Sequence, residues 1–448
     1  MAVDTKHPTI TAEVIADWKR MRDAAAGEST VKLAGETYLP MPSGFAAMPD
    51  RGSKYYAAYK MRAQFPEIVA PSVSAMIGIA HAKEAQIELP PALEYMTETA
   101  TPDGLTLDAL HRRITRELLT VGRFGLLADA PETGGSPWLA GYKSESIINW
   151  DEGFYVLNET AMIRDGFKWA EMPRYRVLEL IDGAYQQSIW QGQPAVQMVV
   201  PAMAAGGKAM PRVPFSVATA VDMTPTICPP PLIGVSRSAM SIYQLSADYR
   251  WQLYMSGQET LVAINGDAPK AVGPGVAHSM RGADGQTPDL KYVSPTCSGI
   301  EAHRLAMEDC RKESVAAGAR LFDQSDTSQE SGEARSLRYA SETATLMSVV
   351  LASCGLLERG LRDIAMMLGQ DENAVVVTPP SDLLDSTMTP ADAAALVGVW
   401  QNGAMSYDTL YDNLQRGGIA SAERTADDEL ALIDKRDIDE SDGGDAAV

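Results

Sequence analysis

The sequence contains few cysteines, and none of them is spaced to bind a metal. Its 448 residues include four cysteines and five histidines, all scattered, and the cysteines are Cys228, Cys297, Cys310 and Cys354. Without a Cys-x-x-Cys pair or a His/Cys/carboxylate cluster, we expect no zinc site and no bound cofactor. The thiols are expected to be free, as is usual in a reducing compartment.

The signature motifs of several enzyme classes are absent too. There is no G-x-x-x-x-G-K-S/T phosphate loop, no G-x-S-x-G nucleophile elbow, no H-E-x-x-H pair and no G-x-G-x-x-G after a strand. The missing phosphate loop excludes the common ATP-driven motors. The other absences exclude the commonest serine hydrolases, zinc proteases and dinucleotide-dependent enzymes. We predict that the chain is not an enzyme and assign no catalytic residue.

Positive charge is scarce. The chain has 38 Lys and Arg against 59 Asp and Glu, a formal net charge of −21. Such a chain is not expected to wrap nucleic acid, because neutralising phosphates requires Lys and Arg. The longest apolar run, Ala344–Leu357, is interrupted by Ser348, Ser353 and Gly355 and is too short for a bilayer, so no membrane partner is expected. The N-terminus has no basic-then-apolar leader, which predicts synthesis in the cytoplasm.

The sequence does contain a helical first part followed by strands. Thr11 is placed to cap a helix that Gly27 ends. Further helices are expected at 55–65, 72–85 and 105–121, and strands at 124–131, 146–151, 174–182, 184–191, 195–201 and 214–221. Asp182-Gly183 predicts a hairpin turn between two of these strands. The pattern predicts an α+β fold with a mainly antiparallel sheet packed on the preceding helices.

The second half alternates long helices with one small β segment. A proline-rich stretch, PPPLIGVSRS, leads into a helix over 236–255, and the strand-like strings TLVAING and LKYVSP follow within a β insertion at 259–296. Ser298 and Glu301 form a capping box for the next helix, which reaches Phe322. After an acidic stretch, DQSDTSQESG, the longest helix covers 333–368.

The longest helix carries a near-heptad stripe of apolar and small residues. The stripe consists of Leu337, Ala340, Ala344, Met347, Leu351, Cys354, Leu361, Ala365 and Leu368, with Glu358 as its exception. At about 1.5 Å per residue, such a helix is roughly 54 Å long. Because few other long helices are available to cover it, we predict that other copies of the chain do so.

The order of these elements resembles that of the portal proteins of tailed bacteriophages. The strings that carry the resemblance are GRFGLLADAP (122–131), ESIINWD (145–151), YRVLELIDGAY (175–185), PPPLIGVS (229–236), YQLSADYRWQLYMSGQETLV (243–262) and GIEAHRLAMEDCRKESVAAGARLF (299–322). The resemblance extends over roughly residues 10–420. It implies a portal-protein fold with an α/β wing, a helical stem, a small β-rich clip and a long kinked helix after a tunnel loop.

Mapped onto this sequence, the resemblance implies a series of regions. They are an N-terminal wing at 1–231, a stem helix at 232–257, a clip at 258–297, a second stem helix at 298–322, a tunnel loop at 323–332, the long helix at 333–369, a C-terminal wing with a short crown at 370–421, and an acidic, disordered tail at 422–448. The clip would meet a packaging motor and later an adaptor, through candidates Thr260, Val262, Ile264, Asn265, Lys291 and Tyr292.

The implied tunnel loop lies at the narrowest point of a channel. Its polar residues are Asp323, Gln324, Ser325, Asp326, Thr327, Ser328, Gln329 and Glu330. A ring of such acidic loops would repel phosphate and keep duplex DNA centred while letting it slide. Arg311, Lys312 and Arg320 precede the loop and are candidates for facing the channel or a neighbouring subunit, although a solvated helix face is the simpler interpretation.

The resemblance implies a ring, usually of twelve subunits, at one vertex of an icosahedral head. The implied partners are further copies of the chain, the major capsid protein, the large terminase subunit, a head–tail adaptor and double-stranded DNA, which passes without sequence-specific contacts. The implied location is the virion. Three alternatives remain: an adaptor ring of the same particle, a non-viral helical scaffold, and a metal-dependent hydrolase or nuclease. The last would use Asp323 with Asp326, or Asp427, Asp428 and Glu429.

Overall fold

The computed structural model describes most of the chain, in two compact units at residues 1–379 and 380–448. The described residues are 2–131, 135–192, 196–200, 209–257, 259–267, 269, 271–272, 279–282, 285–294, 299–316, 318, 332–380, 383, 390–421 and 424–433. The chain mixes helices and sheets, as the α+β prediction requires. The two units are described separately below.

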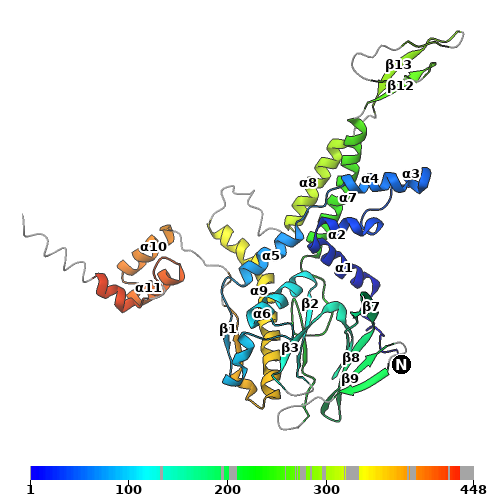
Figure 1. Ribbon diagram of the computed structural model, residues 1–448. Helices are drawn as coiled ribbons and strands as arrows, with labels where there is room; N and C mark the ends of the chain where they lie inside the picture. The colour runs from blue at the N-terminus through cyan, green and yellow to red at the C-terminus, as the bar shows by residue number, and fades with distance from the viewer. Residues whose placement is uncertain are drawn as a thin grey trace, which may run out of the picture. The chain divides into compact units, whose positions relative to one another are not determined.

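Six α-helices lie in the N-terminal part of the first unit (Figure 1). They are α1 (Ala12–Ala26), α2 (Glu28–Leu33), α3 (Ser43–Ala46), α4 (Ser53–Arg62), α5 (Val69–Ala80) and α6 (Leu107–Thr120), with short 3-10 turns at Gly35–Thr37, Pro49–Gly52 and Pro91–Thr97. The Thr11 hydroxyl accepts a hydrogen bond from the Val14 amide at 3.4 Å, and Gly27 ends α1 with a φ of 95°. Both features of α1 were predicted from the local sequence.

Every strand pairing in the described part of the chain is antiparallel. A five-stranded sheet has the order β10-β9-β8-β5-β4, and a three-stranded sheet has the order β11-β2-β3. Their strands are β2 (Arg123–Asp129), β3 (Trp138–Lys143), β4 (Ile147–Asp151), β5 (Phe154–Asn158), β8 (Arg174–Ile181), β9 (Ala184–Gln191), β10 (Val196–Val200) and β11 (Phe215–Thr219). The predicted turn joins β8 to β9 at Asp182-Gly183, where φ is 51° and 75°.

Three two-stranded ribbons complete the strand inventory of the described residues. They are β1 (Gln86–Glu88) with β14 (Val376–Thr378), β6 (Ala161–Asp165) with β7 (Lys168–Met172), and β12 (Thr260–Ile264) with β13 (Asp289–Val293). The sequence analysis predicted β12 and β13. It missed the β6–β7 ribbon, together with β1, β3 and β5.

Helix α9 (Gly332–Met367) is the core helix of the first unit. From Leu346 onward it packs on α6, β2 and β11 of its own chain, and Val350, Leu357, Leu361 and Ile364 are buried there. The prediction that other copies must shelter this helix is therefore wrong for its C-terminal half. Of the predicted stripe, Cys354, Leu361 and Ala365 are buried, whereas Leu351 is half exposed and its neighbour Val350 is buried instead.

The close contact between α9 and the three-stranded sheet depends on a glycine. A Cβ atom added at Gly360 would lie 2.7 Å from a methyl group of Leu126 and 3.0 Å from one of Leu139. By length and composition alone, Ala344–Met367 is apolar enough to cross a membrane. Since 56% of this stretch is buried inside the first unit, we interpret it as a core helix.

The second unit contains α10 (Pro390–Gln401) and α11 (Tyr407–Arg416). Ser406 caps α11, accepting from the Thr409 amide, and the Trp400 and Tyr407 rings meet edge to face with centroids 5.8 Å apart. Residues 426–433 form a further helical segment. The expected disorder of the tail is thus wrong for these residues, and 434–448 lie outside the described ones.

Candidate functional site

The candidate site is a projection made of two helices and a ribbon. Helix α7 (Ile233–Ser256) lies beside α8 (Ile300–Ala316), and the chain passes from one to the other through β12 and β13 (Figure 1). The N-terminal half of α7 is anchored against α1, α4 and α5, with Val235, Tyr243 and Ala247 buried. Its last turns are more open, since Leu253 and Met255 are exposed, although Trp251 still packs on Phe45.

Helix α8 is covered on one side only. Met307, Cys310 and Ser314 are among its less exposed residues, and Ser314 is buried. Arg311 and Lys312 lie on the exposed side; Lys312 Nζ is 3.7 Å from Asp309 Oδ1, whereas Arg311 forms no ion pair with a described residue. Whether a neighbouring subunit or DNA faces them stays a prediction, and Arg320 lies outside the described residues.

One face of the β12–β13 ribbon is exposed, and the other is partly buried at Leu261, Ala263 and Leu290. Antiparallel register pairs Val262 with Lys291 and Ile264 with Asp289, so these side chains share one face with Thr260, while Tyr292 lies on the other. Tyr292 is 61% exposed. Asn265 follows β12 with a φ of 54°, and Lys291 Nζ lies 3.1 Å from Asp289 Oδ2. The structure therefore presents the predicted clip residues to solvent, and their partners stay predictions.

The predicted tunnel-loop residues, 323–330, lie outside the described residues. The second acidic group is described: Asp428 Oδ2 accepts from the Thr425 hydroxyl at 2.7 Å, and Glu429 lies 3.2 Å from Arg424. Within the described ranges, no group of three or more His, Cys, Asp or Glu side chains is placed to hold a metal.

A basic hollow of about 620 Å³ lies at the base of the projection, between α2, α4 and α7. Its lining includes Lys32, Arg62 and Arg250, and the Arg62 guanidinium lies 3.8 Å from the centre of the Tyr254 ring. Neither arginine forms an ion pair with a described carboxylate. The sequence analysis missed this cluster because its three bases come from segments far apart in the chain.

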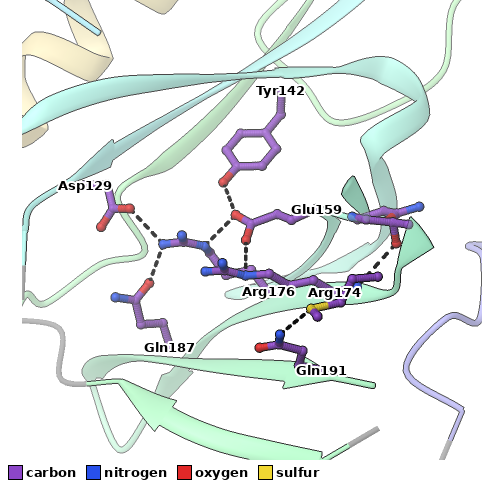
Figure 2. Close-up of polar contacts among 10 residues, drawn as sticks. Asp129, Tyr142, Glu159, Arg174, Arg176, Gln187 and Gln191 are labelled. Carbon is purple, nitrogen blue, oxygen red and sulfur yellow. Dashed lines mark hydrogen bonds and ion pairs between the residues drawn. The ribbon is translucent and has the colours of Figure 1, made fainter. Parts of the chain in front are cut away.

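A buried polar network joins the two main sheets (Figure 2). Arg176 on β8 donates to Glu159 Oε1 at 2.7 Å, to Asp129 Oδ2 at 2.8 Å and to Gln187 Oε1 at 3.0 Å. The Tyr142 hydroxyl donates to Glu159 at 2.6 Å. Burial acts to lower the pKa of Arg176, but Tyr142, Glu159 and Asp129 together raise it. The charged groups of this network thus have hydrogen-bond partners within the protein, which indicates a structural role.

Two further ionisable side chains, those of His111 and Arg123, are buried inside the fold. His111 lies between α6 and α9, 3.1 Å from Ser353 Oγ, and burial lowers its pKa to about 4. Arg123 stacks over Trp150 at 4.2 Å, and burial lowers its pKa to about 10. Its Nε and Nη2 atoms have no hydrogen-bond partner among the described residues. The His81 ring centre lies 4.7 Å from that of His111, and Cys354 Sγ lies 3.6 Å from His111 Nε2, where burial raises the pKa of the thiol to about 11.

Comparison with known proteins gives one family match. A model described as a domain of unknown function, DUF4055, matches residues 231–367. The matched stretch begins just before α7 and ends with α9, so it contains the projection and the core helix. No match to a curated protein sequence is found.

Two solved structures are similar to most of the chain. One is described as the neck of an empty GTA particle computed with C6 symmetry; it is 15% identical, covers 80% of this chain and 91% of its own, and gives a TM-score of 0.40. The other, the neck of a native GTA particle computed with C12 symmetry, is 14% identical, covers 78% and 89%, and gives 0.37. These scores are too low to establish a shared fold.

Proposed function

We propose that the chain is the subunit of a ring-shaped head–tail connector in a phage-like particle, and that it serves there as the portal. The observation that carries the proposal is the projection α7–β12–β13–α8, followed by the acidic segment 323–332 and the core helix α9. This is the order of stem, clip, stem, tunnel loop and long helix that the sequence resemblance implies. A ring of twelve subunits is the number we expect.

The exposure of the projection supports assembly with other copies. A single two-stranded ribbon is marginally stable in water, yet one face of β12–β13 is exposed and the other is only partly buried. Helix α8 is buried only along the face toward α7, and Leu305 on its other side is 48% exposed. Adjacent copies would cover these surfaces, and a closed ring covers them on every subunit.

The charge of the chain supports a sliding contact with DNA. Asp323, Asp326 and Glu330 fall in a stretch without Lys or Arg, between α8 and α9. If that stretch lines a channel, phosphates meet acids and are repelled rather than bound. The partners we propose are the major capsid protein, the large terminase subunit and a head–tail adaptor, and the location is the virion. Within this function no chemistry is required of the chain.

The first test is the assembly state of the purified full chain. We expect mass photometry and negative-stain images to show annular particles with a central hole, at a mass of about twelve chains. A well-folded monomer at every concentration would contradict the proposal. A ring of much lower mass that lacks a channel would favour an adaptor over a portal.

The second test reverses the charge of the acidic stretch. The triple variant Asp323→Lys, Asp326→Lys, Glu330→Lys should assemble like the wild type but bind duplex DNA at least about tenfold more tightly at low salt, because each lysine adds a phosphate contact. Electrophoretic mobility of a labelled duplex measures the change. The matched control, Asp323→Asn, Asp326→Asn, Glu330→Gln, should assemble normally and bind only slightly more tightly. Loss of a metal-dependent hydrolysis in this control would instead support the nuclease alternative.

A further inference from the structure

The β6–β7 ribbon is an arm that no other described part of the chain covers. It extends the β5–β8 pair beyond the five-stranded sheet, and the Glu159 amide donates to the Arg174 carbonyl at 2.8 Å where the two segments meet. All five residues of β6 and the first four of β7 are exposed. Because an isolated two-stranded ribbon is only marginally stable in water, we expect another surface to pack against β6–β7.

The exposed side chains of the arm are largely apolar. Phe167 in the turn is 100% exposed, Trp169 is 64% exposed and Met162 is 56% exposed. Register places Met162, Arg164 and Trp169 on one face, with Ile163 and Ala170 on the other. Large apolar groups gathered at the end of a projecting element are typical of an interaction surface.

The arm has no net charge, unlike the strongly acidic chain that carries it. Residues 161–172 carry two bases, Arg164 and Lys168, and two acids, Asp165 and Glu171, in a chain whose net charge is −21. Neither base forms an ion pair with a described residue; Arg164 Nε donates to the Gly166 carbonyl at 2.7 Å. A second copy of the chain offers many carboxylates to these bases, and the neutral arm approaches it without the repulsion between two acidic surfaces.

From these observations we propose that the β6–β7 arm docks on a second copy of this chain, with Phe167 and Trp169 as its anchors. The inference rests on the proposed ring and identifies an element that joins its subunits outside the α7–α8 projection. Aromatic anchors at the centre of a contact often dominate its free energy. Nucleic acid fits the arm less well, because the two acids alternate with the two bases.

The experiment compares assembly of the full chain in three forms. The arm variant is Phe167→Ser with Trp169→Ser; the matched control is Leu33→Ser with Val221→Ser, which removes two side chains exposed to 84% and 73% elsewhere on the surface. Mass photometry over a concentration series gives the midpoint of assembly. We expect the arm variant to need at least about tenfold more protein than the wild type, as the loss of one anchor contact would cause, and the control to match the wild type.

Hydrogen exchange supplies a second readout that does not depend on substitution. The β6–β7 amides should exchange fast in the dilute monomer and slowly in the assembled wild type. Equal assembly of all three forms, with fast exchange of the arm in the ring, would overturn the inference and leave the ring standing. Protection that appears only when duplex DNA is added would also overturn it. A wild type that never assembles would overturn both the ring and the docked arm.

Discussion

Replacing Arg176 with methionine should lower the free energy of unfolding by about 3–5 kcal/mol, the cost that follows when one partner of a buried ion pair is removed. The Arg176 side chain is only 13% exposed, and it faces the carboxylates of Asp129 and Glu159 at 2.8 and 2.7 Å. Without the guanidinium, Asp129 loses its ion pair and Glu159 keeps only the partly exposed Arg174, so most of this buried negative charge is uncompensated. Chemical denaturation monitored by tryptophan fluorescence measures the loss.

Two controls separate charge from packing in this prediction. Arg174→Met removes a neighbouring guanidinium that is 40% exposed and 3.0 Å from Glu159 Oε2, so its effect should stay below about 1 kcal/mol. Adding Glu159→Gln to Arg176→Met should restore part of the stability, because it removes one of the uncompensated charges. If the second substitution only adds to the loss, the network acts through shape and the charge interpretation is wrong.

This network also shows where prediction from the sequence failed. Glu159 lies 17 residues from Arg176 and Asp129 lies 47 residues away. No local spacing relates them, and they meet only because β8 pairs with β5 at the position where the three-stranded sheet packs. By contrast, the Thr11 cap and the Asp182-Gly183 turn depend on neighbouring residues, and both were predicted.

The buried face of α9 could be predicted only in part from its sequence, for a different reason. Between Leu346 and Met367 the helix is apolar on most of its surface, so its periodicity is compatible with several registers. The three-stranded sheet and α6 select the face that is buried, and that selection depends on contacts between residues distant in sequence.

The β6–β7 arm went unnoticed because its sequence, AMIRDGFKWAEM, does not alternate cleanly between apolar and polar residues. A strand with one buried face shows such alternation, since the buried positions select apolar side chains. The arm has no buried face among the described residues, so no such selection is visible. Its irregular pattern is consistent with a partner surface that is formed only on assembly.

Acid should weaken the first unit through His111. Burial lowers the pKa of this histidine from 6.5 to about 4 in the folded chain, and His81 and Arg112 lower it further while Asp108 opposes them. The folded state therefore holds His111 neutral, and the unfolded state takes up a proton more readily. The stability contribution is complete above pH 6.5 and is lost as the pH falls toward 4. A shift of this size corresponds to about 3 kcal/mol.

The measurement compares the wild type with His111→Gln, which keeps a polar group toward Ser353 but cannot be protonated. Carboxylates also titrate in this range, so the quantity of interest is the difference between the two curves of unfolding free energy against pH. We expect the wild type to lose about 3 kcal/mol relative to the variant between pH 7 and pH 4. His303→Gln, on the half-exposed face of α8, should leave the curve unchanged. Parallel curves for the wild type and His111→Gln would show that the contact between α6 and α9 does not depend on a neutral His111, and that the acid sensitivity of the fold arises elsewhere.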